Sequence, residues 1–261
     1  MSSYETILID RDGPSFVITL NRPNRKNAFS KQLMGEVVDA CKEAEQDSSI
    51  TAVIITGGMD YFSAGADLNE AMQNKTAKQT VDYIDNWLRL NSTIEHLRKP
   101  VIAAIEGFCL TGGWEFAMAC DVRIAVKNST FALTSARIGT VPGAGGTQRL
   151  LRQVGVNRTL DILFKADPID AEHALRIGAI EYLVENGQAL AKAKELVAIY
   201  AQRAPLSLAY CKRVVRGGAQ MDQESALEFE QFVVAAIYST EDKNEGIGAF
   251  LEKRKAVFKG Q

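Results

Sequence analysis

Short apolar runs alternate with longer segments of helical periodicity along the first two thirds of the chain. Four runs have the length and composition of buried strands, at residues 16–20, 52–55, 100–105 and 122–126. After Ser30, which can cap a helix, apolar residues recur at helical spacing as far as Ala44. Residues 77–97 repeat this pattern. Buried strands separated by helices predict an α/β domain with mostly parallel strands.

The pattern changes near residue 190, after which no strand-like run interrupts the chain. Helical segments are predicted near residues 188–203, 205–217 and 222–239, followed by a charged helix over 242–258. We therefore expect two parts in one compact unit. Residues 1–190 form the core, and residues 191–261 form a helical region that packs on the core or on another subunit.

Composition narrows the classes of partner. The chain has 30 Lys and Arg against 32 Asp and Glu, so its net charge of -2 creates no field that attracts nucleic acid or an anionic membrane. No apolar run approaches the roughly 20 residues that span a bilayer. The start, Met1 to Glu5, lacks a basic stretch followed by an apolar one, so no signal peptide is expected. We expect a cytoplasmic protein without a nucleic-acid or membrane partner.

The cysteines and histidines give no sign of metal chemistry. Each of the four cysteines has apolar neighbours and none forms a CxxC pair, which predicts reduced, buried thiols at Cys41, Cys109, Cys120 and Cys211. The two histidines, His96 and His173, are isolated. We expect neither a metal site nor a Ser-His catalytic pair.

Two glycine-containing stretches follow strand-like runs and can bind a negatively charged oxygen. Residues 107–115 (GFCLTGGWE) read as a strand, a glycine turn and the start of a helix, where free N–H groups and the helix dipole favour negative charge. Residues 62–68 (FSAGADL) form a similar small-residue loop. If both lie at one end of a sheet, each can give one N–H to the same oxygen, which makes an oxyanion hole.

Glu115 follows the glycine turn by two residues, so its carboxylate can lie near that oxygen. The residue has two interpretations from position alone: a catalytic carboxylate, or an ordinary acidic residue in the first turn of a helix. Nucleotide-binding fingerprints do not fit, because residues 143–148 (GAGGTQ) lack the third glycine of GxGxxG and no GxxxxGK[ST] occurs.

These stretches, together with GTVPGAGGTQRL at residues 139–150 and EGIGAFLEKRKAVF at 245–258, resemble the crotonase superfamily, the enoyl-CoA hydratase/isomerase family. The resemblance covers about residues 5–260. It implies a core of ββα turns arranged as a spiral, a helical C-terminal trimerisation region, and trimers or dimers of trimers. The implied substrate is an acyl-CoA thioester, with no cofactor beyond the coenzyme A that it carries.

The resemblance also implies roles for particular residues. It assigns the oxyanion hole to the amides of Ala66 and Gly112, and the proton-transfer carboxylate to Glu115. The residues implied in CoA and acyl binding are Arg25, Lys26, Ala28, Ala64, Ala66, Asp67, Leu68, Trp87, Gly112, Trp114, Lys255 and Phe258. Lys255 and Phe258 would come from a neighbouring subunit's tail. A core role for Trp87 and a solvated role for Lys255 stay open.

One departure from the family pattern bears on the reaction. Hydratases of this family normally use two glutamates, and Thr134-Ser135 stands where a Pro-Glu pair is usual, so Ser135 replaces the second glutamate. Hydration with Glu115 as the only carboxylate and Ser135 orienting water is the preferred hypothesis. The substrate is then either an ordinary enoyl-CoA or a conjugated or cyclic dienoyl-CoA. Double-bond isomerisation, hydrolysis of a thioester or ring, and non-catalytic acyl-CoA binding are the alternatives.

Overall fold

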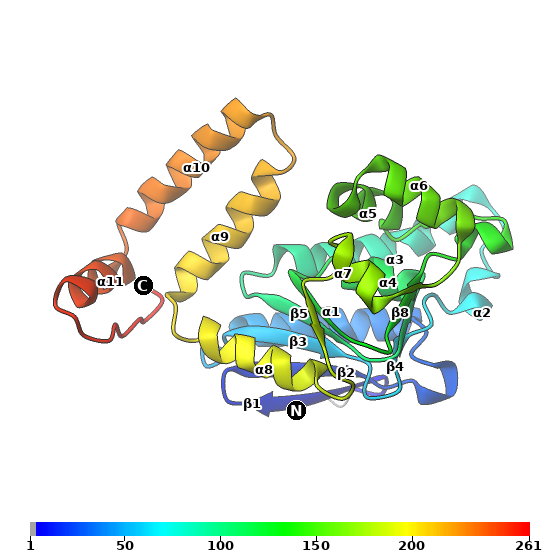
Figure 1. The fold of residues 1–261 in the computed structure, drawn as a ribbon, viewed down its shortest axis with the longest axis horizontal. Helices are drawn as coiled ribbons and strands as arrows, with labels where there is room; N and C mark the ends of the chain where they lie inside the picture. The colour runs from blue at the N-terminus through cyan, green and yellow to red at the C-terminus, as the bar shows by residue number, and fades with distance from the viewer. Residues whose placement is uncertain (1–3) are drawn as a thin grey trace.

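The computed structural model describes residues 4–261, so the first three residues of the expected core at 1–190 lie outside it. Two sheets form the body of the molecule (Figure 1). The larger sheet has the order β1 (Ile7–Asp12), β2 (Ser15–Leu20), β3 (Ala52–Thr56), β5 (Val101–Ile105), β7 (Val122–Val126) and β10 (Tyr182–Val184). The smaller sheet has the order β4 (Tyr61–Ser63), β6 (Phe108–Leu110), β8 (Thr130–Ala132) and β9 (Ile169–Asp170).

The four strands predicted from apolar runs are neighbours in the larger sheet. Strands β2, β3, β5 and β7 pair in parallel, while β1 joins β2 as an antiparallel hairpin. Consecutive side chains on these strands point into two separate hydrophobic clusters. On β3, Val53 and Ile55 belong to one cluster, whereas Ala52 and Ile54 belong to the other. Both faces of the sheet are therefore covered, which explains why these runs are apolar throughout.

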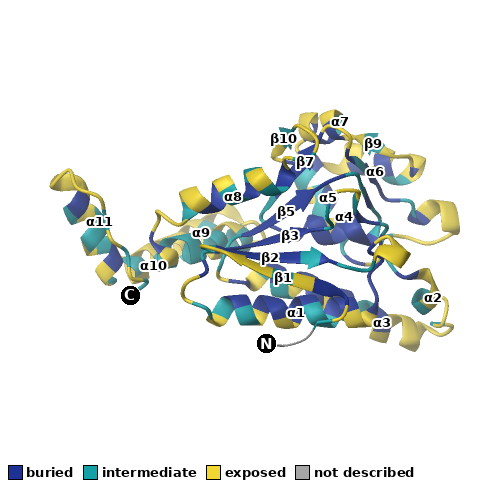
Figure 2. Cartoon of the chain, turned by 90° about the horizontal axis from the view of Figure 1, so that it is seen from below, coloured by how far each residue is buried: buried dark blue, intermediate teal, exposed yellow. Residues whose placement is uncertain are grey.

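Helices cover each face of the larger sheet. The larger hydrophobic cluster includes buried residues of α1 (Lys31–Gln46) and α3 (Ala77–His96), and the other includes buried residues of α8 (Ala189–Tyr200). Ser30 caps α1 by accepting a hydrogen bond from the Leu33 amide, as its position predicts. In Figure 2 the central strands are dark blue, and α1 shows one buried and one exposed side.

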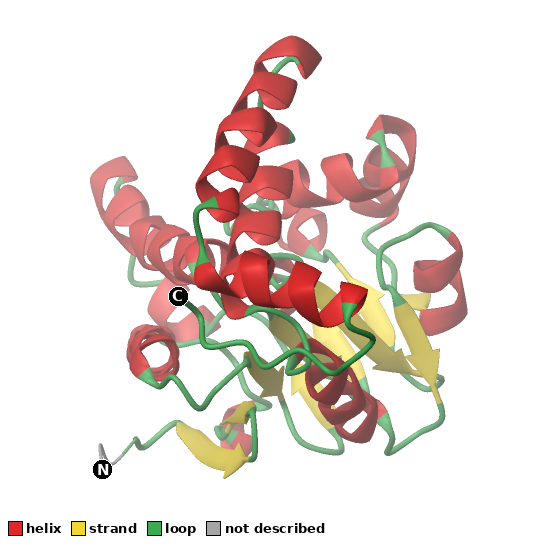
Figure 3. Cartoon of the chain, turned by 90° about the vertical axis from the view of Figure 1, so that its left-hand side faces the viewer, coloured by secondary structure: helices red, strands yellow, loops and turns green. Residues whose placement is uncertain are grey.

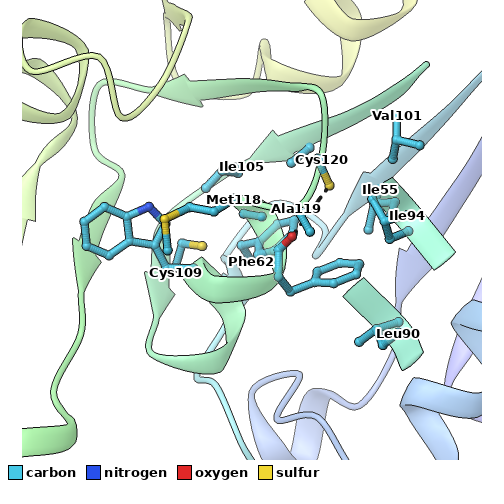
Figure 4. Close-up of a cluster of buried hydrophobic side chains, with 14 of the residues drawn as sticks. Ile55, Phe62, Leu90, Ile94, Val101, Ile105, Cys109, Met118, Ala119 and Cys120 are labelled. Carbon is cyan, nitrogen blue, oxygen red and sulfur yellow. Dashed lines mark hydrogen bonds between the residues drawn. The ribbon is translucent and has the colours of Figure 1, made fainter. Parts of the chain in front are cut away.

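Shorter helices follow the strands of the smaller sheet, and Figure 3 shows the helices arranged around the strands. These elements are α2 (Leu68–Ala71), α4 (Gly112–Ala117), η2 (Ser135–Ile138), α5 (Gly146–Val154), α6 (Val156–Lys165) and α7 (Ala171–Arg176), whereas the short helix η1 (Pro23–Arg25) follows β2. The core beside α4 collects side chains from both sheets and from α3 (Figure 4). Ile55, Leu90, Ile105 and Cys109 lie there, and none of them is exposed. This packing fixes α4 against the sheets.

The C-terminal helices extend away from the sheets. Helices α9 (Pro205–Gly218) and α10 (Gln223–Tyr238) run side by side, and α11 (Glu241–Leu251) follows them at the far end (Figure 1). Neither α9 nor α10 contains a buried residue. Ion pairs tie α9 to the body, since Asp121 accepts from Lys212 at 2.7 Å and from Arg216 at 2.8 Å. The domain boundary near residue 190 stays a prediction.

Two expectations about this region were wrong. The charged helix predicted over 242–258 ends at Leu251, because acidic side chains of α11 bind the returning chain. Glu245 accepts from Arg254 at 2.7 Å and from the Val257 amide at 2.8 Å. Cys211 is exposed rather than buried, because α9 stands away from the core; Cys41, Cys109 and Cys120 are buried. Over residues 4–261, the helices are all too short or too polar to cross a bilayer.

Candidate active site

Three strand ends of the smaller sheet bring the expected site residues to one edge. Strands β4, β6 and β8 are parallel neighbours, so the residues that follow them lie at the same end. Ala66 follows β4 by three residues, Gly112 follows β6 by two, and Ser135 follows β8 by three. The Thr111 amide donates to the Ala132 carbonyl at 2.7 Å, which joins the segment after β6 to the end of β8.

The amides of Ala66 and Gly112 are both free to donate. Phe29 pairs with residues 64–68, the loop that follows β4 and is called the first loop below. The Phe29 amide donates to the Gly65 carbonyl at 2.7 Å, and the Phe29 carbonyl accepts from the Asp67 amide at 3.0 Å. The Ala66 N–H between them makes no hydrogen bond with any residue of 4–261. The Gly112 amide opens α4 and also has no acceptor within that range. A methyl group on Gly112 would lie 3.3 Å from the Ala66 nitrogen, so the two segments are adjacent.

Close packing and backbone strain shape this pair of loops. Thr111 has φ of 45° and ψ of -119°, a backbone conformation that residues other than glycine rarely adopt. This strained turn redirects the chain from β6 into α4. Gly65 has φ of 101°, and a methyl group there would lie 1.7 Å from the Thr111 hydroxyl oxygen. Only glycine fits at this approach of the two loops.

Glu115 lies one helical turn beyond Gly112 and is only 3% exposed. Its side chain tilts toward the start of α4, as helical geometry requires. The Oε1 atom accepts hydrogen bonds from the Ala144 amide at 2.9 Å and the Gly146 amide at 2.8 Å. Burial raises the pKa of Glu115, while these two N–H groups and the Arg149 guanidinium act to lower it. The Oε2 atom has no hydrogen bond from any described residue.

One side of helix α3 faces this site. A methyl group on Gly112 would lie 2.5 Å from Trp87 Cη2, so the indole packs directly on the glycine turn. Four residues later, Asn91 Nδ2 donates to the Ala144 carbonyl at 2.7 Å. That carbonyl also accepts from Arg149 Nη1 at 2.8 Å, and Glu95 holds Arg149 through two contacts of 2.7 and 2.9 Å. Trp87 therefore combines a buried position with contact to the candidate site.

Ser135 opens η2 and is 8% exposed. Its carbonyl accepts from the Thr140 amide at 3.1 Å, and its hydroxyl makes no hydrogen bond with residues 4–261. The side chain is thus buried at the same sheet edge as Glu115 and is free to bind a further molecule.

The residues expected to meet CoA lie beside the first loop. Arg25 and Lys26 are exposed in and after η1, and Lys26 Nζ lies 5.9 Å from the centre of the Phe108 ring. The Ala64 amide donates to the Lys26 carbonyl at 2.9 Å, which joins this segment to the loop. Ala28 is buried, and its carbonyl accepts a hydrogen bond from Arg22. Asp67 is also buried and forms an ion pair with Arg22 at 3.0 Å. Leu68 is 57% exposed.

The other three expected residues are farther from this loop or more deeply buried. Trp114 is fully buried in α4 and packs on Phe131, with ring centres 5.5 Å apart. Lys255 is exposed and Phe258 half-buried in the tail. Phe258 packs near Gly246 of α11, and α11 lies at the opposite end of the molecule from α2 (Figure 1). Within one chain the tail does not reach the candidate site.

Sequence reasoning missed Asn91 and Arg149, which restrain the segment that binds Glu115. Asn91 had a recognisable signal: it lies four residues after Trp87, on the buried side of the expected helix at 77–97. Arg149 had none, because an arginine in an amphipathic helix usually faces solvent.

Comparison with known proteins agrees with this architecture. Residues 14–261 match the family model described as enoyl-CoA hydratase/isomerase. The matched residues include those of the two free amides and the buried carboxylate. The chain therefore belongs to the enoyl-CoA hydratase/isomerase family. This confirms the expected crotonase-type α/β fold and the expected class of enzyme, a lyase of the enoyl-CoA hydratase/isomerase type.

Particular relatives are similar over nearly their whole length. The chain is 38% identical to the short-chain-enoyl-CoA hydratase of Clostridium acetobutylicum over 251 residues, 95% of each protein. It is 37% identical to the crotonyl-CoA hydratase of Syntrophomonas wolfei over 257 residues, 98% of each. The crystal structure of an enoyl-CoA hydratase from Bacillus anthracis superposes with a TM-score of 0.93 and 32% identity, covering 98% of this chain and all of that one.

Proposed function

We propose that this enzyme adds water reversibly across the α,β double bond of an enoyl-CoA thioester, with Glu115 as its only catalytic carboxylate. One observation carries the proposal: two free amides, of Ala66 and Gly112, lie on adjacent loops one helical turn from the buried Glu115 carboxylate. The names of the two relatives above, both hydratases, support the same reaction.

In the proposed mechanism, the Ala66 and Gly112 amides donate to the thioester oxygen. Glu115 takes a proton from water as the water oxygen bonds to the β-carbon, and the π electrons move through the α-carbon onto the thioester oxygen. The enolate then takes the proton back from Glu115 at the α-carbon, so the product has gained one water. Removing one such oxyanion donor costs other enzymes about 100- to 1000-fold in rate.

Ser135 takes the place of a second carboxylate in this proposal. Its buried hydroxyl has no hydrogen bond to described residues and can orient water or a polar part of the substrate. A hydroxyl at neutral pH supplies no charge, so Glu115 must both accept and return the proton. The substrate is then an ordinary enoyl-CoA, or a conjugated or cyclic dienoyl-CoA whose geometry demands a different proton donor.

Binding of the CoA part is assigned to the first loop and to a second chain. Arg25, Lys26, Ala28 and the backbone of residues 64–68 contact the nucleotide, while Trp87 and Trp114 border the acyl group. Lys255 and Phe258 close over CoA from a neighbouring subunit in a homotrimer or dimer of trimers. They follow α11, and Phe258 packs near Gly246 of that helix, which lies at the opposite end of the molecule from α2 (Figure 1). The enzyme is cytoplasmic and needs no cofactor beyond the CoA of its substrate.

The proposal is tested by incubating the purified protein with saturated, crotonyl, aromatic and cyclic dienoyl-CoA esters and measuring product mass. Gain or loss of one water on an unsaturated ester is expected, and Glu115→Gln should lower the rate at least 100-fold while CoA binding is retained. Glu106→Gln is the matched control. Glu106 is a buried carboxylate that also accepts two amide hydrogen bonds, from Gly187 and Ala189, but these lie away from the site.

Other outcomes would select the alternatives. A shifted double bond without a change of mass indicates an isomerase, and hydrolysis products indicate a thioesterase or ring-cleaving hydrolase. Tight binding without turnover across the panel indicates a non-catalytic acyl-CoA-binding protein. Full hydratase activity in Glu115→Ala would refute the mechanism.

A further inference from the structure

Asn91 occupies a position that stability alone does not explain. The residue is fully buried on the apolar side of α3, between Leu90 and Ile94. Its Nδ2 donates to the Ala144 carbonyl at 2.7 Å, but its Oδ1 is buried and has no partner among the described residues. A buried amide with one end unsatisfied lowers stability, and an apolar side chain of similar size would avoid that cost.

The contact made by Asn91 restrains the segment that holds Glu115. The Ala144 amide donates to Glu115 Oε1 at 2.9 Å, and the Ala144 carbonyl accepts from both Asn91 and Arg149. Ala144 is therefore held from both sides, with Glu115 on one and the two donors on the other.

The segment needs such restraint because its neighbours are glycines. Gly143 and Gly145 flank Ala144, and Gly145 has φ of 97°, which few other residues adopt. Glycine gives the backbone freedom that must be removed for Ala144 and Gly146 to keep both amides aimed at Glu115. If Asn91 does not donate, Arg149 is the one remaining donor to the Ala144 carbonyl among residues 4–261.

We propose that Asn91 is a positioning residue for the reaction, which acts through Ala144 to hold Glu115 Oε1 and so keeps Oε2 directed at water and substrate. The inference rests on the proposed role of Glu115 but adds a residue from a different helix, 53 positions from Ala144 in sequence. Asn91 does not touch the reacting atoms in this scheme.

The test compares Asn91→Leu with the parent enzyme on its best enoyl-CoA substrate. We expect kcat to fall about 10- to 100-fold, because small displacements of catalytic groups have effects of this size. KM should change little, and the melting temperature should not fall, because leucine removes the unsatisfied Oδ1. In a plot of kcat against pH, the acid limb should move to higher pH. The Ala144 and Gly146 amides lower the pKa of Glu115, and a less restrained segment loses part of that effect.

Asn86→Leu is the matched control. Asn86 lies on the same helix, and its Nδ2 donates to the Asp82 and Tyr83 carbonyls of that helix. It should keep the parent kcat and acid limb. In a Glu115→Gln background, Asn91→Leu should cause no further loss, because its effect passes through the carboxylate.

The inference is wrong if folded Asn91→Leu has the same kcat and the same acid limb of the pH profile as the parent enzyme. It is also wrong if kcat falls but the acid limb does not move. If that variant does not fold, Asn91→Ala removes the donor without adding a charge. NMR titration of Glu115 in carbon-labelled protein gives a readout independent of turnover: its midpoint should rise in either variant. A parent enzyme without hydratase activity would refute the proposed function, whereas an unmoved midpoint would refute the role of Asn91.

Discussion

At the scale of single residues, Glu115 is subject to opposing effects. Burial raises its pKa most strongly, while two backbone N–H groups and Arg149 favour the charged form. A raised pKa makes the carboxylate a better base toward water, and the carboxyl group that results can give its proton to the more basic α-carbon of the enolate. This balance suits a site in which one carboxylate does both tasks.

The raised pKa of Glu115 also predicts a pH-dependent effect on stability. Since the pKa in the folded protein exceeds the ordinary value of 4.5, ionisation of Glu115 destabilises the folded state as pH rises through the folded pKa. Glu115→Gln should therefore melt at a higher temperature than the parent at pH 8. The difference should shrink as pH falls through the raised pKa, because the folded carboxyl then takes up its proton. Calorimetric melts at several pH values test this, and a difference independent of pH would contradict it.

At the scale of elements, a glycine is required by close packing in one helix and is dispensable in another. Gly35 lies within α1, and a methyl group there would have no neighbour within 4 Å. Gly113 lies in α4, where a methyl group would be 2.8 Å from Ser63 Cβ. The Ser63 hydroxyl donates to Asn27 and accepts from Gly65, so it cannot move freely. Close packing requires glycine in α4 but not in α1.

This contrast predicts opposite signs for one substitution. Gly35→Ala should stabilise the protein by about 0.5–1 kcal/mol, because alanine loses less conformational entropy in a helix. Gly113→Ala should destabilise it, because Ser63 must shift. Urea unfolding measures both changes. Destabilisation by Gly35→Ala would show that α1 contacts something that the chain alone does not provide.

At the scale of the whole molecule, the C-terminal helices expose apolar surface. Leu227, Val234 and Tyr238 lie on one side of α10 at helical spacing and are 57, 48 and 60% exposed. Such a stripe is typical of an interface. In the proposed mode of CoA binding, Lys255 and Phe258 also come from a second chain.

We therefore expect a mass of at least three times the 28.5 kDa of one chain in light scattering. Leu227→Asp should lower that mass and raise KM for the acyl-CoA. Leu8→Asp is the control, since Leu8 is 55% exposed on β1. It should keep the parent mass and KM. A monomeric parent with full activity would exclude the proposed role of the neighbouring tail.

The sequence by itself determined the four central strands, the start of α1, the extent of α3, and the position of Glu115 one turn into a helix after a glycine turn. These features depend on local periodicity and on residues close together in the chain, which amino-acid order records directly. The tertiary structure decided that Asn91 and Arg149 share the Ala144 carbonyl, that the tail folds back after Leu251, and that Cys211 is exposed. Those outcomes depend on contacts between distant segments, whose geometry follows from how the sheets and helices pack rather than from any local pattern.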